Sequence, residues 1–301
     1  NHTLFRYFKN NNFKLLIHLL YFVNLLFMKY SIFIFIISFS FVLSAQTKRC
    51  STDEYRAVLK ERGKSFSSHN ISSLTPLNES SGSIPVVVHI LYNNNEQNIS
   101  DERIASQITV LNEDYNAANP ELMNVPQDFE NIIGNVGFSF CLVQTDLNGN
   151  PFSGINRVYT EIASFQGFSD DMKLSSQGGV DAWDTEKYLN IWVCNLAGNT
   201  LGFATFPGDV EPEFDGVVID YEYFGVNLSS SNPYNLGRTG THEIGHYFNL
   251  EHTFNAGCSS WDNCDDTPAI ASPTYGCPSF PQESCQTVNM TMNFMDYTND
   301  A

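Results

Sequence analysis

Basic residues are scarce in this 301-residue chain, which has 15 Lys and Arg against 33 Asp and Glu and a formal net charge of −18. Residues 1–45 contain four of the basic residues and none of the acidic ones, so the remainder has 11 basic and 33 acidic residues. A nucleic-acid-binding surface needs clustered Lys and Arg, and this balance therefore argues against a nucleic-acid partner. It suits a soluble exported protein with oxygen-rich cation sites, although a solvated acidic surface explains most of the charge.

An unbroken apolar run of membrane-spanning length is also missing. The apolar stretch 15–43 is interrupted by Lys29, whereas a spanning helix needs about 20 consecutive apolar residues. From Met28 the sequence instead follows the pattern of a secretory signal, with a charged start, an apolar centre and small residues before the cleavage point. We therefore predict that residues 1–27 are translated upstream sequence and that residues 28–45 are a signal peptide, so that the protein is exported in the bacterial manner. A membrane anchor is the alternative.

The seven cysteines include no Cys-x-x-Cys pair, which disfavours a zinc site built from thiolates. Four of them lie within 28 residues of a loop-rich segment: Cys258, Cys264, Cys277 and Cys285. In an exported protein such a cluster indicates disulfides, with a second zinc site as the alternative. Cys141 and Cys194 lie in apolar runs and are predicted to be buried thiols.

One short segment combines three histidines with an acid. His242 and His246 are four residues apart, so on a helix they share one face and can both reach one Zn²⁺. Glu243 is adjacent to the first histidine, where its carboxylate can act as general base toward water. His252 can join the same ion only if the chain bends after His246, and Asn249 favours the bend because Asn tolerates the left-handed conformation that ends helices. Three nitrogen ligands with an open fourth position are typical of catalytic zinc.

A chance match to this histidine pattern would occur in roughly one chain in several thousand. Met295, forty-three residues after His252, lies in the run Asn293-Phe294-Met295-Asp296-Tyr297, which resembles the Met-turn of the metzincin peptidases. In those enzymes a methionine, here Met295, lies beneath the three histidines as an apolar floor. Asn249 stands where most metzincins have Gly, a mild departure.

Further segments between residues 82 and 301 resemble the pappalysin (cytophagalysin-like) branch of the metzincins. They are Ile84–His89, Phe140–Leu142, Leu189–Cys194, His252–Phe254 and Asp266–Pro268. The zinc motif, the last of these segments and the Met-turn are the specific parts of the resemblance. It implies a secreted zinc peptidase in which Glu243 is the general base and Tyr297 supports the oxyanion. A buried structural tyrosine is the alternative for Tyr297.

The pattern of apolar residues predicts a mixed α/β (α+β) domain over residues 82–301, with a twisted, mostly parallel five-stranded sheet, an active-site helix and an irregular C-terminal subdomain. The strands are expected at 84–92, 137–143, 188–194, 202–206 and 216–220, and the helices at about 101–115 and 235–248. Residues 46–81 are polar, with one helical patch at 53–62, and are predicted to be a pro-segment and linker. Because family members continue past the Met-turn, the catalytic domain is expected to be C-terminally truncated.

The resemblance also implies the binding residues. Gly202, Phe203 and Ala204 are expected to form a sheet edge that binds substrate by main-chain hydrogen bonds, with an ordinary internal strand as the alternative. Asp300 lies where basic-specific members have the acid that pairs with the Arg or Lys after the scissile bond. A solvated turn residue is the alternative for Asp300.

Three further features follow from the same resemblance. Asp262, Asp265, Asp266 and Thr267 are expected to bind Ca²⁺, with an exposed acidic loop as the alternative. Cys50 is expected to occupy the fourth zinc position in a latent form, although a spare thiol is the alternative. Cys258 is expected to pair with Cys285, and Cys277 with a cysteine beyond residue 301.

The sequence thus predicts a secreted, monomeric zinc endopeptidase that cleaves proteins and peptides before Arg or Lys, with Zn²⁺ and Ca²⁺ as cofactors and no stable membrane insertion. A binding or adhesion module with structural zinc and a zinc exopeptidase or amidase are the two alternatives. Glu243 argues against the former, because a structural site needs no base and closes its fourth position with a protein ligand.

Overall fold

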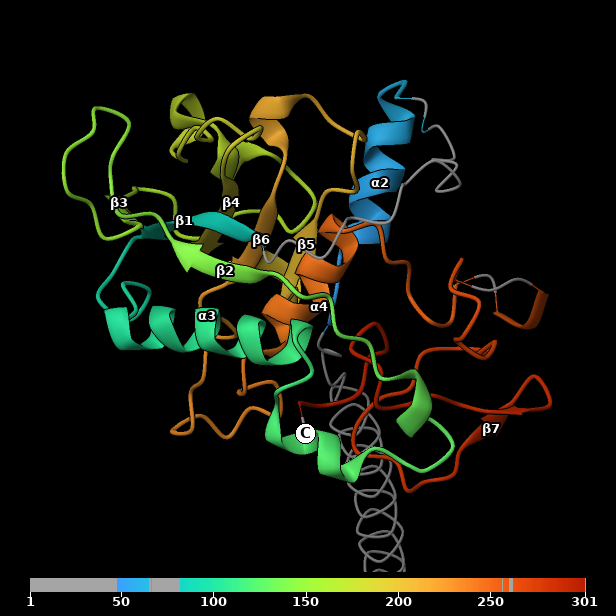
Figure 1. Cartoon of the computed structure of the whole chain (residues 1–301). Helices are drawn as coiled ribbons and strands as arrows, with labels where there is room; N and C mark the ends of the chain where they lie inside the picture. The colour runs from blue at the N-terminus through green and yellow to red at the C-terminus, as the bar shows by residue number, and fades with distance from the viewer. Residues whose placement is uncertain (1–47, 65, 67–81, 256, 260–261, 301) are drawn as a thin grey trace, which may run out of the picture. The chain divides into compact units, whose positions relative to one another are not determined.

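The computed structural model describes residues 48–64, 66, 82–255, 257–259 and 262–300 (Figure 1). These residues belong to one compact unit that begins at residue 47. The predicted upstream sequence, the predicted signal peptide and most of the predicted linker lie outside the described residues. Within the described part of the chain, no helix is both long enough and apolar enough to cross a membrane.

A six-stranded sheet forms the centre of this unit. Its strands run in the order β2 (Ser139–Leu142), β1 (Ser83–Tyr92), β4 (Leu189–Cys194), β6 (Val217–Asp220) and β5 (Gly202–Ala204), and β3 (Ile155–Tyr159) pairs with β1 beyond the end of β2. Every pairing is parallel except that of β5 with β6. The mostly parallel α/β sheet is therefore confirmed, with β3 as one strand more than predicted. The residues of β3 are mostly half-buried, so the strand lacks the apolar run that marks the others.

Two helices cover one face of the sheet, as Figure 1 shows. α3 (Asp101–Tyr115) starts at Ser100, whose hydroxyl accepts a hydrogen bond from the Arg103 amide, as expected of an N-cap. It packs beside α4 (Arg238–Tyr247). Ile104 and Ile244 join the inward side chains of β1, β4 and β6 in the larger apolar core. The strands of this core are apolar throughout because both of their faces are covered.

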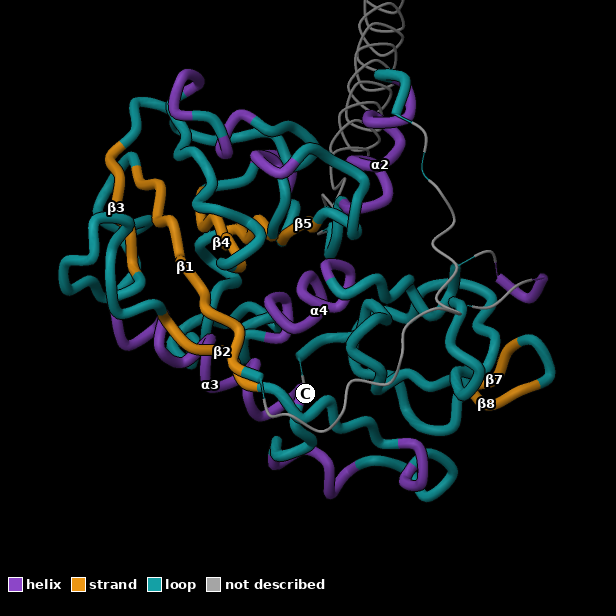
Figure 2. Tube along the Cα trace, turned by 45° about the horizontal axis from the view of Figure 1, so that its top comes forward, coloured by secondary structure: helices purple, strands orange, loops and turns teal. Residues whose placement is uncertain are grey.

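A third helix lies at the opposite face, beside β5 (Figures 1 and 2). This is α2 (Thr52–Glu61), which begins and ends one residue before the predicted helical patch at 53–62. Its Tyr55 and Leu59 are buried with Trp192 and Phe203 in a second apolar cluster. Residues 48–64, here called the N-terminal segment, therefore pack as part of the same unit as the sheet.

The chain after α4 contains little regular structure. Its described elements are a short turn at Gly257–Ser259 and the two-stranded hairpin β7 (Glu283–Ser284) and β8 (Thr287–Val288). The predicted Cys258–Cys285 disulfide is present. Cys194 is buried as predicted, but the prediction for Cys141 was wrong: it is exposed, because β2 has no strand on its outer side and its alternation turns Phe140 inward instead.

Candidate metal centre

The helix α4 and the turn that follows it bring three histidines together. His242 and His246 share one helix face, and all three histidines are buried. α4 begins at Arg238, three residues later than predicted, because Gly237 has a φ of 83°. After the helix, Asn249 has a φ of 73°, so the predicted bend is present and returns the chain toward the helix with His252.

The Nδ1 atom of each imidazole ring contacts an oxygen atom, and this contact fixes the orientation of the ring. His242 Nδ1 lies 2.6 Å from the carbonyl oxygen of Phe294, His246 Nδ1 lies 2.8 Å from that of Leu250, and His252 Nδ1 lies 3.2 Å from Oδ2 of Asp53. The three Nε2 atoms are left to face a common centre, and two of them, on His246 and His252, are only 3.1 Å apart. Burial lowers the pKa of His242 and of His246, so both are neutral, as metal ligands must be.

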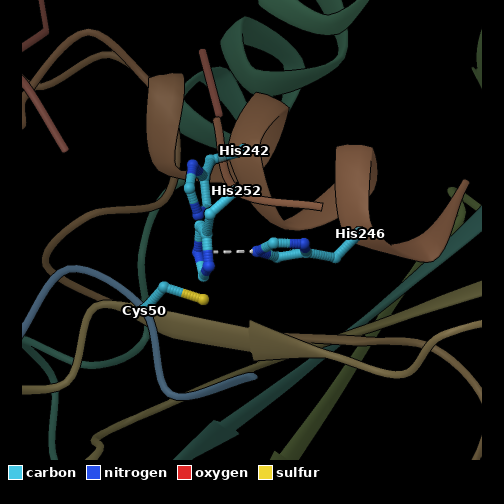
Figure 3. Close-up of side chains that lie close together, drawn as sticks. All are labelled: Cys50, His242, His246 and His252. Atoms are coloured by element: carbon cyan, nitrogen blue, oxygen red, sulfur yellow. Dashed lines mark hydrogen bonds between the residues drawn. The ribbon is translucent and has the colours of Figure 1, made fainter. Parts of the chain in front are cut away.

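Cys50 completes this group from the N-terminal segment, and Figure 3 shows its sulfur directed toward the rings. The ligand atoms of Cys50 and the three histidines all lie within 4.8 Å of one another. His242 Nε2 is buried and has no hydrogen-bond partner among the described residues, which is costly unless a ligand satisfies it. Three imidazoles and one thiol are a donor set that Zn²⁺ prefers. The residues present therefore fit a zinc ion.

Glu243 lies beside this centre and is fully buried. Its Oε2 accepts hydrogen bonds from the Cys50 thiol at 3.4 Å and from the Thr52 hydroxyl at 3.2 Å. In the part of the chain that the structure describes, Oε1 has no hydrogen-bond partner. Burial raises the pKa of Glu243 to about 8, although the bonds from Cys50 and Thr52 oppose the shift. The carboxyl group is thus held next to the metal position, with one oxygen available to accept a proton or a hydrogen bond.

The predicted Met-turn lies under α4. Met295 is buried, and its Sδ lies so near Gly245 that a Cβ on this glycine would be only 2.4 Å away. The helix can approach the turn this closely because residue 245 has no side chain. Beside the methionine, the ring of Tyr297 packs at 5.8 Å from that of His242 and 5.0 Å from that of His252.

The N-terminal segment follows the outer edge of β5. The Ser51 amide donates to the carbonyl oxygen of Gly202 at 3.0 Å, and the Ala204 amide donates to the Thr52 hydroxyl at 3.0 Å. β5 is the end strand of the sheet, so these main-chain groups would otherwise lack a strand partner. The structure therefore brings Gly202, Phe203 and Ala204 to an edge, beside the histidines.

Asp300 is engaged by the residue that precedes Cys50. Arg49 Nη1 lies 3.4 Å from Asp300 Oδ1, and the two side chains are 3% and 0% exposed. The other carboxylate oxygen accepts hydrogen bonds from the amides of Leu236 and Arg238, at 2.9 and 3.2 Å. The Arg49 guanidinium also lies 4.7 Å above the ring of Tyr234. Asp300 is thus a buried acid that binds an arginine, and not the solvated turn residue of the alternative.

The predicted calcium residues are less closely grouped. Asp262 is buried and accepts a hydrogen bond from the Cys264 amide, whereas Asp265 and Asp266 are exposed. Asp265, Asp266 and Thr267 line an open hollow of about 400 Å³ together with Asp128. Among the described residues, Cys50 and the three histidines are the only set of three or more His, Cys, Asp or Glu side chains whose ligand atoms lie close enough to share one ion.

An extracellular metalloprotease of Arthroderma gypseum is 31% identical over 286 residues, which cover 91% of this chain and 85% of the relative. The profile of the Peptidase M43 family, described as Pregnancy-associated plasma protein-A, matches residues 174–301. The chain belongs to the pappalysin family. It is accordingly a zinc metalloprotease, which confirms the class of enzyme that the sequence predicted.

Solved structures of the family agree with the fold. Tannerella forsythia mature mirolysin in complex with a cleaved peptide is 47% identical, with a TM-score of 0.71 over 73% of this chain and 85% of that chain. A promirolysin variant from the same organism is 46% identical, with a TM-score of 0.72 over 74% of this chain and 76% of that chain. The metzincin-like fold is therefore confirmed for this chain.

Two contacts of the site were not predicted from the sequence, and both come from one short motif. Arg49 and Asp53 lie in the run Arg49-Cys50-Ser51-Thr52-Asp53, in which the sequence predicted a role for Cys50 alone. The structure places the first against Asp300 and the second against His252. The available signal was the clustering of a cation, a thiol and an acid within five residues of a segment otherwise predicted to be a linker.

Proposed function

We propose that this protein is a secreted zinc endopeptidase, held latent by its N-terminal segment, that cleaves before Arg or Lys with Glu243 as general base. The convergence of three buried imidazole nitrogens beside an uncommitted carboxylate, at the edge of a sheet, carries the proposal. The naming of the relatives as extracellular supports secretion.

The residues of the site supply the chemistry of hydrolysis. His242, His246 and His252 would hold the Zn²⁺, which when bound acts as a Lewis acid toward the scissile carbonyl and acidifies water. Glu243 takes the proton of the attacking water at Oε1, which has no hydrogen-bond partner among the residues that the structure describes, and delivers it to the leaving amine. The packing of Tyr297 against two of the histidines suits a hydroxyl that donates to the oxyanion.

An endopeptidase is favoured over an exopeptidase by the path of the N-terminal segment. This segment pairs with the chain beside Thr200, passes the histidines at Cys50 and continues past Ala204 into α2. The space between the edge of β5 and the three histidines, here called the groove, therefore accepts a continuous chain that extends on both sides of the metal position. A site that required a free chain end would be closed on one side.

Preference for a basic residue is supported by the pairing of Arg49 with Asp300. Two backbone amides hold the carboxylate in place, and an arginine of this chain already fills the position beside it. A substrate Arg or Lys could make the same charge-assisted contact. An apolar side chain would leave the buried charge unpaired, at a cost.

Latency is supported by the number of substrate-binding elements that one segment covers. Cys50 faces the metal position and binds Glu243, its neighbours bind the edge of β5, and Arg49 fills the pocket at Asp300. Thiolate is a strong zinc ligand, so Cys50 would exclude water from the fourth position.

The closure of the fourth position by Cys50 also favours a second candidate function, a binding module with a structural zinc held by three histidines and one cysteine.

Activation separates these two functions. Full-length protein is incubated with a trace of trypsin, and cleavage of a denatured protein is followed by mass spectrometry. We expect internal cuts before Arg or Lys that appear as the N-terminal segment is lost. Glu243→Gln should keep one zinc per chain, measured by atomic absorption, and reduce kcat/KM by about 10²–10⁴. Unchanged activity in this variant would exclude Glu243 as the base, and removal of the segment without any gain of activity would favour structural zinc.

The loop at residues 262–267 is the proposed calcium site. The buried Asp262 and the exposed Asp265 and Asp266 place several hard oxygen donors on one loop, which suits Ca²⁺. The loop follows the third histidine within fifteen residues, so an ion there would stabilise the irregular part of the chain that supports the metal centre.

A further inference from the structure

Tyr55 of α2 is completely buried in a pocket that the rest of the unit provides. Its hydroxyl donates a hydrogen bond of 2.6 Å to Oδ1 of Asp170. Its ring lies 5.1 Å from the ring of Phe203, and Nζ of Lys173 lies 4.9 Å from the ring centroid. The phenol is therefore contacted at its hydroxyl by Asp170, at its ring by Phe203 and over its ring face by Lys173.

The walls of this pocket do not depend on Tyr55 for their positions. Lys173 Nζ donates to the carbonyl oxygen of Phe214 at 2.7 Å and lies 3.3 Å from Asp170. It also lies 5.7 Å from the ring of Trp192, whose indole nitrogen donates to the Val180 carbonyl. These partners of Lys173 and Trp192 all lie outside the N-terminal segment, whereas Asp170 is also contacted by Arg62 of that segment, 3.7 Å from its Oδ2. Loss of that segment would leave a preformed pocket with an aromatic wall and an ion pair.

The chemistry of the pocket selects a phenol. A phenylalanine would fill the apolar part but would leave the Asp170 oxygen without its hydroxyl donor. A basic side chain would meet the ammonium of Lys173, and an acidic one would meet the carboxylate of Asp170. A tyrosine donates to the carboxylate and presents its ring face to the ammonium, as Tyr55 does.

The Tyr55 pocket lies next to β5, on the path of the N-terminal segment past the metal position. Phe203 is the central residue of β5. Its neighbours contact the N-terminal segment: the Gly202 carbonyl accepts from the Ser51 amide, and the Ala204 amide donates to the Thr52 hydroxyl. Along that segment Arg49 reaches Asp300, Cys50 reaches the histidines, and Tyr55 lies beyond them. If the residue after the scissile bond binds at Asp300, the Tyr55 pocket belongs to the side that binds residues before that bond.

We propose that the pocket of Asp170, Lys173 and Phe203 is a substrate subsite of the activated enzyme, which binds a tyrosine on the amino-terminal side of the scissile bond and which Tyr55 fills in the latent form. This inference rests on the proposed function, because it requires that the N-terminal segment leaves.

The test uses activated enzyme and quenched fluorescent peptides with Arg fixed after the scissile bond. Tyr, Phe or Ala is placed in turn at each of the five positions before the bond. We expect Tyr to raise kcat/KM over Phe by about tenfold at one position, as for a hydrogen bond to a charged group. Asp170→Asn should reduce this preference to less than about twofold. The matched control is Asp171→Asn, which changes the same charge at the adjacent exposed residue and should keep the preference.

A binding measurement separates failure of this inference from failure of the proposed function. Synthetic peptides of residues 48–64 with Tyr or Phe at position 55 are titrated into trypsin-activated protein that carries Glu243→Gln, so that the peptides are not cleaved, and Kd is measured by calorimetry. The Tyr peptide should bind about tenfold more tightly, and this difference should be lost in Asp170→Asn. Peptides that are all cleaved without preference for Tyr, or equal Kd values for the two segment peptides, would overturn the subsite. Absence of any cleavage together with the expected Kd difference would count against the proposed function alone.

Discussion

At the scale of single residues, local spacing predicted much of the metal centre. His242 and His246 follow from helix geometry, and the return of His252 follows from the backbone preference of Asn249. The pairing of Arg49 with Asp300 joins residues 251 positions apart, and no local pattern encodes such a contact. The resemblance to a family identified Asp300, but nothing in the sequence showed which side chain of this chain would reach it.

The contact between Gly245 and Met295 gives a prediction about stability. Gly245→Ala would place a Cβ 2.4 Å from Sδ of Met295, so the Met-turn or the helix must shift, at a cost of about 1–3 kcal/mol. Urea denaturation should show a lower midpoint with an unchanged m value. Because the clash requires the methionine, Gly245→Ala with Met295→Ala should cost less than the sum of the two single changes. Additive costs would show that the two residues do not meet in this way.

The pocket at Asp300 gives a prediction about specificity. Asp300→Asn removes the charge while one oxygen can still accept from a backbone amide, so the fold should be retained. Activated wild type should prefer Arg over Leu after the scissile bond by about 10²-fold, and the variant should lose most of this preference. The measurement is kcat/KM on two peptides that differ only at that residue. Asp184→Asn, at an exposed turn, is the control, and a wild type that prefers Leu would refute the assignment.

At the scale of elements, the sequence predicted the helices and most strands but not how the N-terminal segment packs. The patch that became α2 was identified as helical, yet its burial against β5 depends on the fit of Tyr55 to a pocket assembled from distant segments. β3 was missed because its residues alternate poorly in polarity and are only half-buried. Helix start and stop residues are local signals, whereas the partner of an exposed edge is not.

The N-terminal segment gives a prediction about activation. Cys50→Ser keeps the size of the side chain but removes the strong zinc ligand, so the segment should be held less tightly and full-length protein should mature faster by at least about tenfold. Maturation is followed by gel electrophoresis and by peptide cleavage over time. Cys141→Ser, at an exposed free thiol far along the chain, should mature as the wild type does. Equal maturation rates for Cys50→Ser and wild type would contradict the thiol switch.

At the scale of the whole unit, the two parts of the chain are stabilised in different ways. The sheet and its helices bury two apolar clusters, and their apolar runs are the strongest signal in the sequence. The chain after α4 has few regular elements and includes the Cys258–Cys285 disulfide and a loop of acidic residues. Periodicity cannot predict such a region, since its conformation depends on cross-links and on individual hydrogen bonds.

The irregular chain after α4 gives a prediction about calcium. If the loop at Asp262, Asp265 and Asp266 binds Ca²⁺, an ion at 100 times its Kd should stabilise the folded state by about 2.7 kcal/mol. For a unit of this size the Tm should then rise by roughly 5–10 °C. Differential scanning fluorimetry compares Ca²⁺ with a calcium-selective chelator, at constant zinc. Asp262→Asn combined with Asp266→Asn should abolish the shift, whereas Asp184→Asn should preserve it. The same Tm with and without Ca²⁺ in the wild type would exclude a calcium site in this loop, because binding to the folded state alone must raise the Tm.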